Sequence, residues 1–280
     1  MPRSIPRSLL FVPGHRQEML AKAADRGADA VVLDLEDSVP VAMKDEARQH
    51  VAAALANWPA GSPVRRFVRI NAPRFGWVDD DLRVLAGHHD VTIVVPKVDH
   101  VIELDPVRGS AEGRDIVVNI ETPRSLLHAE SFADAIGVTG LFLGGEDLSA
   151  AIGLRRTPDG VELQAARWTL LLAARAAGIA AWDSICPEFR DDAPLKRECD
   201  MAAAMGFDGK FAIHPAQIPT IHTAFTPSTE DVDNARRIVE AYDAAVSQGI
   251  GAVSVDGAMV DPPVAERARA VLARAAGQTA

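Results

Sequence analysis

The sequence contains only two cysteines, Cys186 and Cys199, in 280 residues. They show neither a CxxC spacing nor the density of a disulfide framework, so we expect reduced thiols without a special role. A long apolar run is also lacking, since no stretch approaches the roughly 18 apolar residues of a membrane-spanning helix. The first residues carry no apolar core with a small-residue cleavage pattern. These absences predict a cytoplasmic protein.

Basic residues are in deficit. The chain has 29 Lys and Arg against 39 Asp and Glu, a formal net charge of -10. Nucleic-acid-binding proteins usually need a basic face, so the charge argues against nucleic acid as the main partner. The 48% of hydrophobic residues is enough to bury a full core. This length and composition favour one large α/β domain with a small appendage.

Short apolar segments recur along the chain and alternate with helix-like segments rich in Ala, Leu, Glu and Arg. The predicted strands cover residues 8–13, 30–36, 65–71, 91–98, 115–122, 140–147, 180–185 and 209–214. Residues 15–27 and 161–178 are predicted helices, and Gly178 closes the second. Eight strand–helix repeats predict a (β/α)8 TIM barrel. An open doubly wound sheet is the alternative, but it usually has a Gly-rich phosphate turn after its first strand, which VPGHRQ is not.

The composition changes after the eighth predicted strand, at TPST (226–229), where a hydroxyl side chain can cap a helix. Asp256-Gly257 lies between two short apolar runs and predicts a β-hairpin. The hairpin places Asp261 before two prolines and a last helix. We therefore divide the chain into a TIM-barrel catalytic domain, residues 1–225, and a helix–hairpin–helix lid, residues 226–280. The lid is too small to bury much core alone, so we expect it to cover its own barrel or a neighbouring subunit's site.

Acidic residues close the fifth and sixth predicted strands, where Glu121 follows DIVVNI and Asp147 ends GLFLGGED. Neighbouring strands lie roughly 4.8 Å apart, so acids at the same level can reach one cation. Mg2+ is usually held by one or two carboxylates together with water and substrate oxygens, and Mn2+ favours similar ligands. Glu121 and Asp147 are therefore the candidate metal ligands. Glu146, beside Asp147 on the predicted strand, is expected to point to the opposite face.

Active sites of TIM barrels form at the C-terminal ends of the strands, and polar residues stand at most of these ends. They are Asp34, Glu36, Asp37, Arg69, Asn71, Lys97, Glu121, Asp147, Asp183 and His214. Arg69 ends an apolar strand and needs an anionic partner, either a substrate oxygen or one of Glu36 and Asp37. We expect these two acids to hold waters and Arg69 in place. Lys97 is either a Schiff-base lysine or, as the neighbouring metal pair favours, an ion-pairing one.

In order along the chain, RSLLFVPG, VVLDLEDSV, VRIN, PKV, ETP, GGEDLSAAIG, IHPAQ and DGxMxD resemble the citrate lyase β-subunit-like branch of the HpcH/HpaI aldolase superfamily. This superfamily also holds malyl-CoA and citramalyl-CoA lyases. The resemblance implies a barrel with a C-terminal lid, assembled as a homotrimer or a hexamer. It also implies Mg2+-dependent cleavage or formation of a carbon–carbon bond in a 3-hydroxyacyl-CoA, with acetyl-CoA and a 2-oxo acid as products.

Carried over by residue, the resemblance implies that Glu121 and Asp147 bind the metal and that Arg69 binds the substrate. Asp261 resembles an acid that a neighbouring subunit's lid contributes to the site, and it is our candidate acid–base group. Ala258 replaces a frequent Lys in this lid motif. The contacts that this Lys would make in the lid are therefore lost, whereas Asp261 is kept.

Phe11, Arg16 and Lys22 are similar to positions that contact the CoA portion. Two exposed cations on a helix are otherwise an ordinary solvated face. A metal-dependent aldolase acting on a free hydroxy-oxo acid is the alternative, and Arg16 and Lys22 would then have no role. Two further hypotheses remain. The protein could be a non-catalytic subunit, or it could belong to a citrate lyase complex whose substrate is a carrier-protein thioester.

Overall fold

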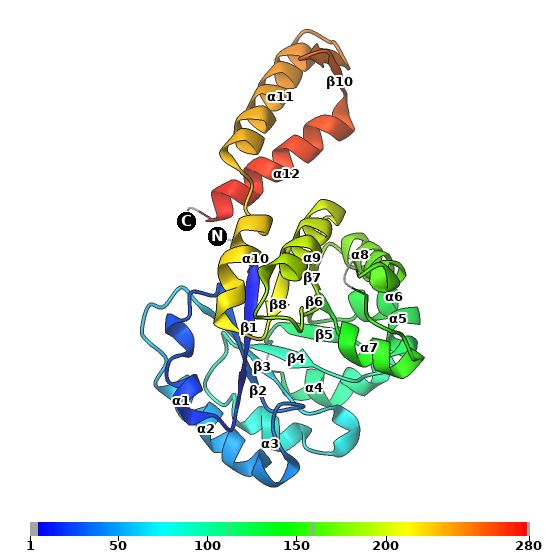
Figure 1. Ribbon diagram of the computed structural model, residues 1–280. Helices are drawn as coiled ribbons and strands as arrows, with labels where there is room; N and C mark the ends of the chain where they lie inside the picture. The colour runs from blue at the N-terminus through cyan, green and yellow to red at the C-terminus, as the bar shows by residue number, and fades with distance from the viewer. Residues whose placement is uncertain (1–4, 112, 158–159, 279–280) are drawn as a thin grey trace. The chain divides into compact units, whose positions relative to one another are not determined.

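The computed structural model describes residues 5–111, 113–157 and 160–278. Eight parallel strands close a barrel in the order of the sequence (Figure 1). They are β1 (Ser8–Pro13), β2 (Ala30–Asp34), β3 (Arg65–Arg69), β4 (Thr92–Val95), β5 (Ile116–Ile120), β6 (Val138–Leu143), β7 (Ala180–Asp183) and β8 (Gly209–Ala212). The predicted (β/α)8 barrel is confirmed. Most strands end before their predicted limits, because the polar residues at those limits lie in the loops that follow.

Helices connect the strands around the barrel. They are α1 (Gln17–Leu20), α2 (Lys44–Ala56), α3 (Val78–Arg83), α4 (Asp105–Ser110), α5 (Pro123–Leu127), α6 (Ala129–Ala133), α7 (Gly145–Ile152), α8 (Gln164–Ala176), α9 (Asp192–Met205) and α10 (Ile218–Phe225). The helix predicted over 161–178 is confirmed in α8, and Gly178 follows it with a φ of 70°. The helix predicted over 15–27 is wrong in extent, since α1 ends at Leu20. Leu20 is its one buried residue, so packing stabilises a longer helix there only weakly.

The inside of the barrel is filled by side chains from alternate positions of the strands. They are Leu9, Ala30, Val32, Phe67, Val94, Val117, Phe142, Ala180, Trp182 and Phe211. The rings of Phe142 and Phe211 stack with centroids 3.7 Å apart, and Phe11 lies 5.2 Å from Phe211. The barrel is therefore a packed core, and a substrate can only bind at its end.

The chain divides into two compact units, Ile5–His222 and a C-terminal unit whose described residues run from Thr223 to 278. The C-terminal unit contains α11 (Thr229–Ser247), the hairpin β9 (Val253–Val255) and β10 (Ala258–Val260), and α12 (Pro262–Gln278). Helices α11 and α12 pack side by side (Figure 1). None of the described helices of either unit has both the length and the hydropathy needed to cross a bilayer.

Short sequence motifs determine where the helix and the hairpin of the C-terminal unit form. Ser228 is the N-cap of α11 and accepts a hydrogen bond from the backbone N–H of Asp231 at 3.0 Å. At the hairpin, Asp256 and Gly257 have φ values of 50° and 81°, which is the backbone of a two-residue turn that suits the twist of a hairpin. The predicted cap and hairpin are both confirmed. Tyr242 packs with Val260 and other apolar residues of the hairpin and α12, which gives the unit a small core of its own.

Candidate active site

Arg69 and Asp34 lie opposite each other in the pairing of β2 and β3. Arg69 donates from Nε and Nη2 to the two carboxylate oxygens of Asp34, both at 2.7 Å. Its Nη1 lies 3.1 Å from Glu36 Oε2. Burial alone would raise the pKa of Asp34, but the Arg69 guanidinium outweighs it and lowers that pKa to about 2. Arg69 is thus a fixed cation, paired with Glu36 as expected and also with Asp34, whose role the sequence did not reveal.

The guanidinium of Arg69 also lies over the ring of Phe11, with 4.6 Å between Cζ and the ring centroid. Phe11 is half-buried, and its contacts with Phe142 and Phe211 join it to the top of the barrel core. Phe11 therefore forms the floor beneath Arg69, a contact that its predicted role toward CoA did not anticipate.

The ammonium of Lys97 contacts three acids that follow two strands, β2 and β6. Its ammonium lies 2.8 Å from Glu36 Oε1, contacts the Asp37 carboxylate, and lies 3.8 Å from Asp147 Oδ1. Burial alone would lower the pKa of Lys97, but its hydrogen bonds to Asp37 and Glu36 outweigh this and raise the pKa above its usual range. A Schiff-base lysine needs a neutral amine. The structure therefore favours the ion-pairing role.

Glu121 follows β5 and is 1% exposed. Its Oε1 accepts the backbone N–H of Lys97 at 2.7 Å, and its Oε2 accepts the side-chain amide of Asn119. Burial raises the pKa of Glu121 well above its usual value; Arg69 opposes this, while Asp147 adds to it. The Cβ of any residue other than glycine at position 144 would lie 2.3 Å from Glu121 Cβ, so the backbone that follows β6 approaches the Glu121 side chain closely.

Asp147 lies in the first turn of α7, and its side chain is 44% exposed. The prediction that Glu146 and Asp147 belong to the sixth strand is wrong, because β6 ends at Leu143. Gly144 completes the ladder by donating its N–H to Ile120 O at 3.0 Å, and its own carbonyl accepts from Leu148 at 3.1 Å to start the helix. The two acids point apart because they are successive residues of a helix. Glu146 contacts Arg156.

Glu121 and Asp147 have the donor chemistry of a magnesium site. Among the described residues, no group of three or more His, Cys, Asp and Glu side chains is placed to hold a metal ion. The candidate ligands are a pair of carboxylates. Such a pair is a usual protein contribution to Mg2+ binding. Burial is the main cause of the raised pKa of Glu121 and the Asp147 carboxylate adds to it, so a divalent cation bound by the two acids would oppose both effects.

The remaining predicted site residues belong to other segments of the chain. Arg16 and Lys22 are exposed beside α1, at the C-terminal end of β1. Asp261 belongs to the C-terminal unit, where its Oδ1 accepts the backbone N–H of Val264 at 3.3 Å at the start of α12. Asn71, Asp183 and His214 have partners that explain them locally, for example Asp81 for the Asn71 amide at 2.8 Å.

A closed barrel whose strand ends gather Arg69, Lys97 and a set of carboxylates defines the class of the protein, a TIM-barrel enzyme with an acid-rich site. Residues 7–215 match the family model described as HpcH/HpaI aldolase/citrate lyase. The chain therefore belongs to this family of lyases, and the resemblance seen in its motifs is confirmed.

Individual relatives agree over nearly the whole chain. Citrate lyase subunit beta of Escherichia coli is 38% identical over 96% of this chain and 93% of its own length. A (3S)-malyl-CoA thioesterase of Cereibacter sphaeroides is 35% identical over 96% of this chain and 94% of its own. The crystal structure of protein CitE from Mycobacterium tuberculosis in complex with magnesium, acetoacetate and coenzyme A is 37% identical. It covers 96% of this chain and 98% of its own, with a TM-score of 0.81.

Proposed function

We propose that this protein is a Mg2+-dependent carbon–carbon lyase acting on a 3-hydroxyacyl-CoA thioester, such as malyl-CoA, citramalyl-CoA or a citryl thioester. The products of cleavage are acetyl-CoA and a 2-oxo acid. One observation carries the proposal: Glu121, Asp147 and Arg69 meet at one end of the barrel through Lys97 and Glu36. The family match supports the reaction class, and the magnesium and coenzyme A in the CitE complex support the metal and the thioester.

Glu121 and Asp147 would hold the metal, which supplies a Lewis acid that polarises the oxygens of the 2-oxo or 2-hydroxy acid. Arg69 has five N–H donors, of which two donate to Asp34, while Glu36 adds an ion pair at Nη1. Its other donors are available to a substrate carboxylate or to an oxygen that gains negative charge. Since Asp34 already fixes the guanidinium, Arg69 needs little reorganisation when charge develops.

Cleavage requires a base for the hydroxyl proton of the substrate, and we assign this role to Asp261 of a neighbouring subunit. As the proton leaves, the hydroxyl carbon becomes the carbonyl of the 2-oxo acid. The electron pair of the broken carbon–carbon bond passes to the α-carbon of the thioester as an enolate, which takes up one proton to give acetyl-CoA. The C-terminal unit of the neighbouring subunit would close over the barrel end and exclude bulk water from the enolate. This requires an oligomer, which we propose to be a homotrimer or hexamer, and we place the enzyme in the cytoplasm.

Thioester hydrolysis is a second candidate, because one relative is named a thioesterase. Both are tested by incubating the metal-loaded protein with malyl-CoA and with citramalyl-CoA, with and without EDTA. We expect EDTA-sensitive release of acetyl-CoA with an equal amount of glyoxylate or pyruvate. Free CoA and the hydroxy acid would instead identify a thioesterase. No product from either thioester would contradict the proposal and favour a free-acid aldolase, a carrier-protein thioester or a non-catalytic subunit.

A further inference from the structure

The first turn of α7 carries Asp147, and its N-terminus has no side-chain cap. Two hydrogen bonds hold its first residue instead: Gly145 donates its N–H to Ser184 Oγ at 3.1 Å, and its carbonyl accepts Ser149 Oγ at 2.6 Å. Because the Asp147 side chain is 44% exposed, little packing fixes it directly. The direction of its carboxylate therefore depends on what holds this turn of the helix.

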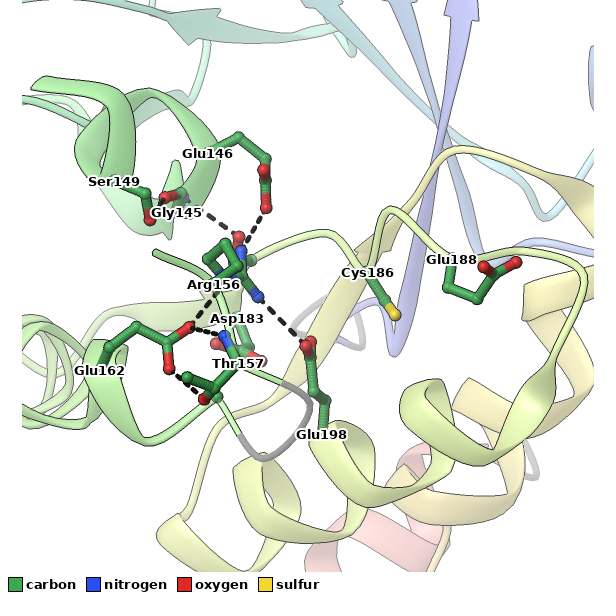
Figure 2. A network of polar contacts seen from close by, with 12 residues as sticks. Gly145, Glu146, Ser149, Arg156, Thr157, Glu162, Asp183, Cys186, Glu188 and Glu198 are labelled. Atoms are coloured by element: carbon green, nitrogen blue, oxygen red, sulfur yellow. Dashed lines mark hydrogen bonds and ion pairs between the residues drawn. The ribbon is translucent and has the colours of Figure 1, made fainter. Parts of the chain in front are cut away.

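Arg156 holds the turn through Glu146. Figure 2 shows its guanidinium between three glutamates from three elements. It contacts Glu146 in α7, lies 3.0 Å from Glu162, and lies 3.1 Å from Glu198 in α9. The Arg156 side chain is 19% exposed, so its ion pairs are only partly screened by water. The planar guanidinium fixes all three carboxylates relative to one another.

The other end of this network is anchored in the barrel. Glu198 accepts a hydrogen bond from Lys210 on β8 at 2.9 Å, and Lys210 donates to Asp183 on β7 at 2.7 Å. Arg167 of α8 pairs with the same Asp183 at 2.7 Å. Lys210, Asp183 and Arg167 have fully buried side chains. A continuous chain of ion pairs thus runs from two barrel strands to the residue that precedes Asp147.

We propose that Arg156 is a positioning residue for the metal site. It fixes the first turn of α7 against β7, β8 and α9, and so directs the Asp147 carboxylate toward Glu121. The inference rests on the proposed function, since it assumes that Asp147 binds Mg2+. Mg2+ demands near-ideal ligand geometry, so a small displacement of one ligand weakens binding.

The test separates positioning from simple electrostatics by the sign of the effect. Replacing Arg156 by Met removes a positive charge near the site, and charge alone would make Mg2+ bind more tightly. Loss of positioning predicts the opposite, about a tenfold higher dissociation constant, as is usual when the support of a metal ligand is removed. The constant is measured by isothermal titration calorimetry of Mg2+ into the metal-stripped protein, well below the melting temperature.

Two further variants complete the design. Glu146→Gln also breaks the contact, and its half-exposed position keeps the fold if Arg156→Met does not fold. We expect it to weaken Mg2+ binding, but loss of its negative charge alone predicts the same sign, so Arg156→Met carries the comparison with charge. Positioning through one shared contact predicts that the double variant Glu146→Gln, Arg156→Met binds Mg2+ no more weakly than the weaker single variant, whereas charge alone predicts that the two substitutions offset each other. Arg175→Met is the matched control, since Arg175 links α8 to Asp208 at 2.8 Å and its other hydrogen bonds go to the backbone carbonyls of Ile179 and Gly206. It should leave the constant unchanged.

The Mg2+ dissociation constants of these variants can contradict the positioning role of Arg156. Wild-type affinity or tighter binding in Arg156→Met would overturn the positioning role, as would wild-type affinity in Glu146→Gln if Arg156→Met does not fold. Both conclusions require that the wild-type protein binds Mg2+ and that Glu121→Gln does not. If the wild-type protein itself binds no Mg2+, the proposed function has failed and the inference falls with it.

Discussion

Asp34 and Arg69 form a buried ion pair with two hydrogen bonds of 2.7 Å, between strands that place these two residues at the same level. Through this pair, the second strand of the barrel determines the orientation of the arginine on the third. The pair is also a source of pH-dependent stability in the barrel.

Replacing Asp34 by Asn leaves Arg69 without its principal partner, and we expect a loss of about 3 kcal/mol in the free energy of unfolding at pH 7. The folded-state pKa of Asp34 is lowered to about 2 from its usual value of 3.8. Its stabilisation is therefore complete above pH 4 and is lost as the pH falls toward 2. The difference in the free energy of unfolding between wild type and Asp34→Asn should therefore narrow by about 2 kcal/mol as the pH falls from about 4 to about 2. Urea unfolding at a series of pH values measures it, with the exposed Asp45→Asn as control; parallel curves would contradict it.

Glu121→Gln should abolish calorimetric Mg2+ binding and reduce metal-dependent turnover by more than about 100-fold, since even indirect partners of a metal ligand are worth 10- to 100-fold. The far-UV circular dichroism should stay that of the wild type, because a neutral amide of the same shape suits the buried position. Unchanged turnover at saturating substrate would refute the assignment of Glu121 as a ligand.

Borohydride should not trap a covalent adduct between Lys97 and pyruvate. Hydrogen bonds to Asp37 and Glu36 outweigh burial and raise the pKa of Lys97, so its amine stays protonated and is not nucleophilic. Intact-protein mass spectrometry after reduction checks this, with a Schiff-base aldolase treated in parallel. A mass increase that maps to Lys97 would show that the amine is free to react.

Complementation tests whether Asp261 acts on a neighbouring subunit. Asp261→Ala and Glu121→Gln should each be inactive, but their co-expression should restore activity at about a quarter of the sites, those that combine an intact barrel with an intact neighbouring lid. Glu121→Gln co-expressed with Asp147→Asn is the control and should stay inactive. If the first pair also stays inactive, Asp261 does not serve a neighbour's site.

The CoA role of Arg16 and Lys22 predicts a change in KM alone. Each exposed cation contributes up to about 1 kcal/mol toward a phosphate, so Arg16→Ala and Lys22→Ala should each raise the KM for the thioester by about two- to fivefold, with kcat unchanged. Arg26→Ala, an exposed arginine of the same segment, is the control. A wild-type KM in Arg16→Ala, Lys22→Ala and Arg26→Ala alike would favour a substrate without CoA.

The sequence predicted the barrel because buried parallel strands are short continuous apolar runs, which eight segments of this chain are. It did not predict where the sixth strand becomes a helix. The Gly144-Gly145 pair permits either continuation, and only the ladder bond to Ile120 and the helix bond from Leu148 decide between them. Asp147 was therefore identified as a candidate ligand while its element was assigned wrongly.

The sequence also could not predict which acid forms the two hydrogen bonds with Arg69. Three acids, Asp34, Glu36 and Asp37, follow one another within four positions, and the choice among them depends on the register between β2 and β3. Registers are set by the closure of the whole barrel. The contact between Arg156 and Glu146 also needs tertiary structure, since the connection between α7 and α8 brings these residues together.

Lys97 has a φ of 53°, a backbone conformation that a lysine rarely adopts and that glycine or asparagine adopts more readily. This conformation turns its N–H toward Glu121 while its side chain reaches Glu36 and Asp37. Selection for stability alone would therefore favour replacing this lysine, whereas selection for the charge balance of the site would retain it. In a library randomised at this position, the most heat-resistant clones and the most active clones should carry different residues.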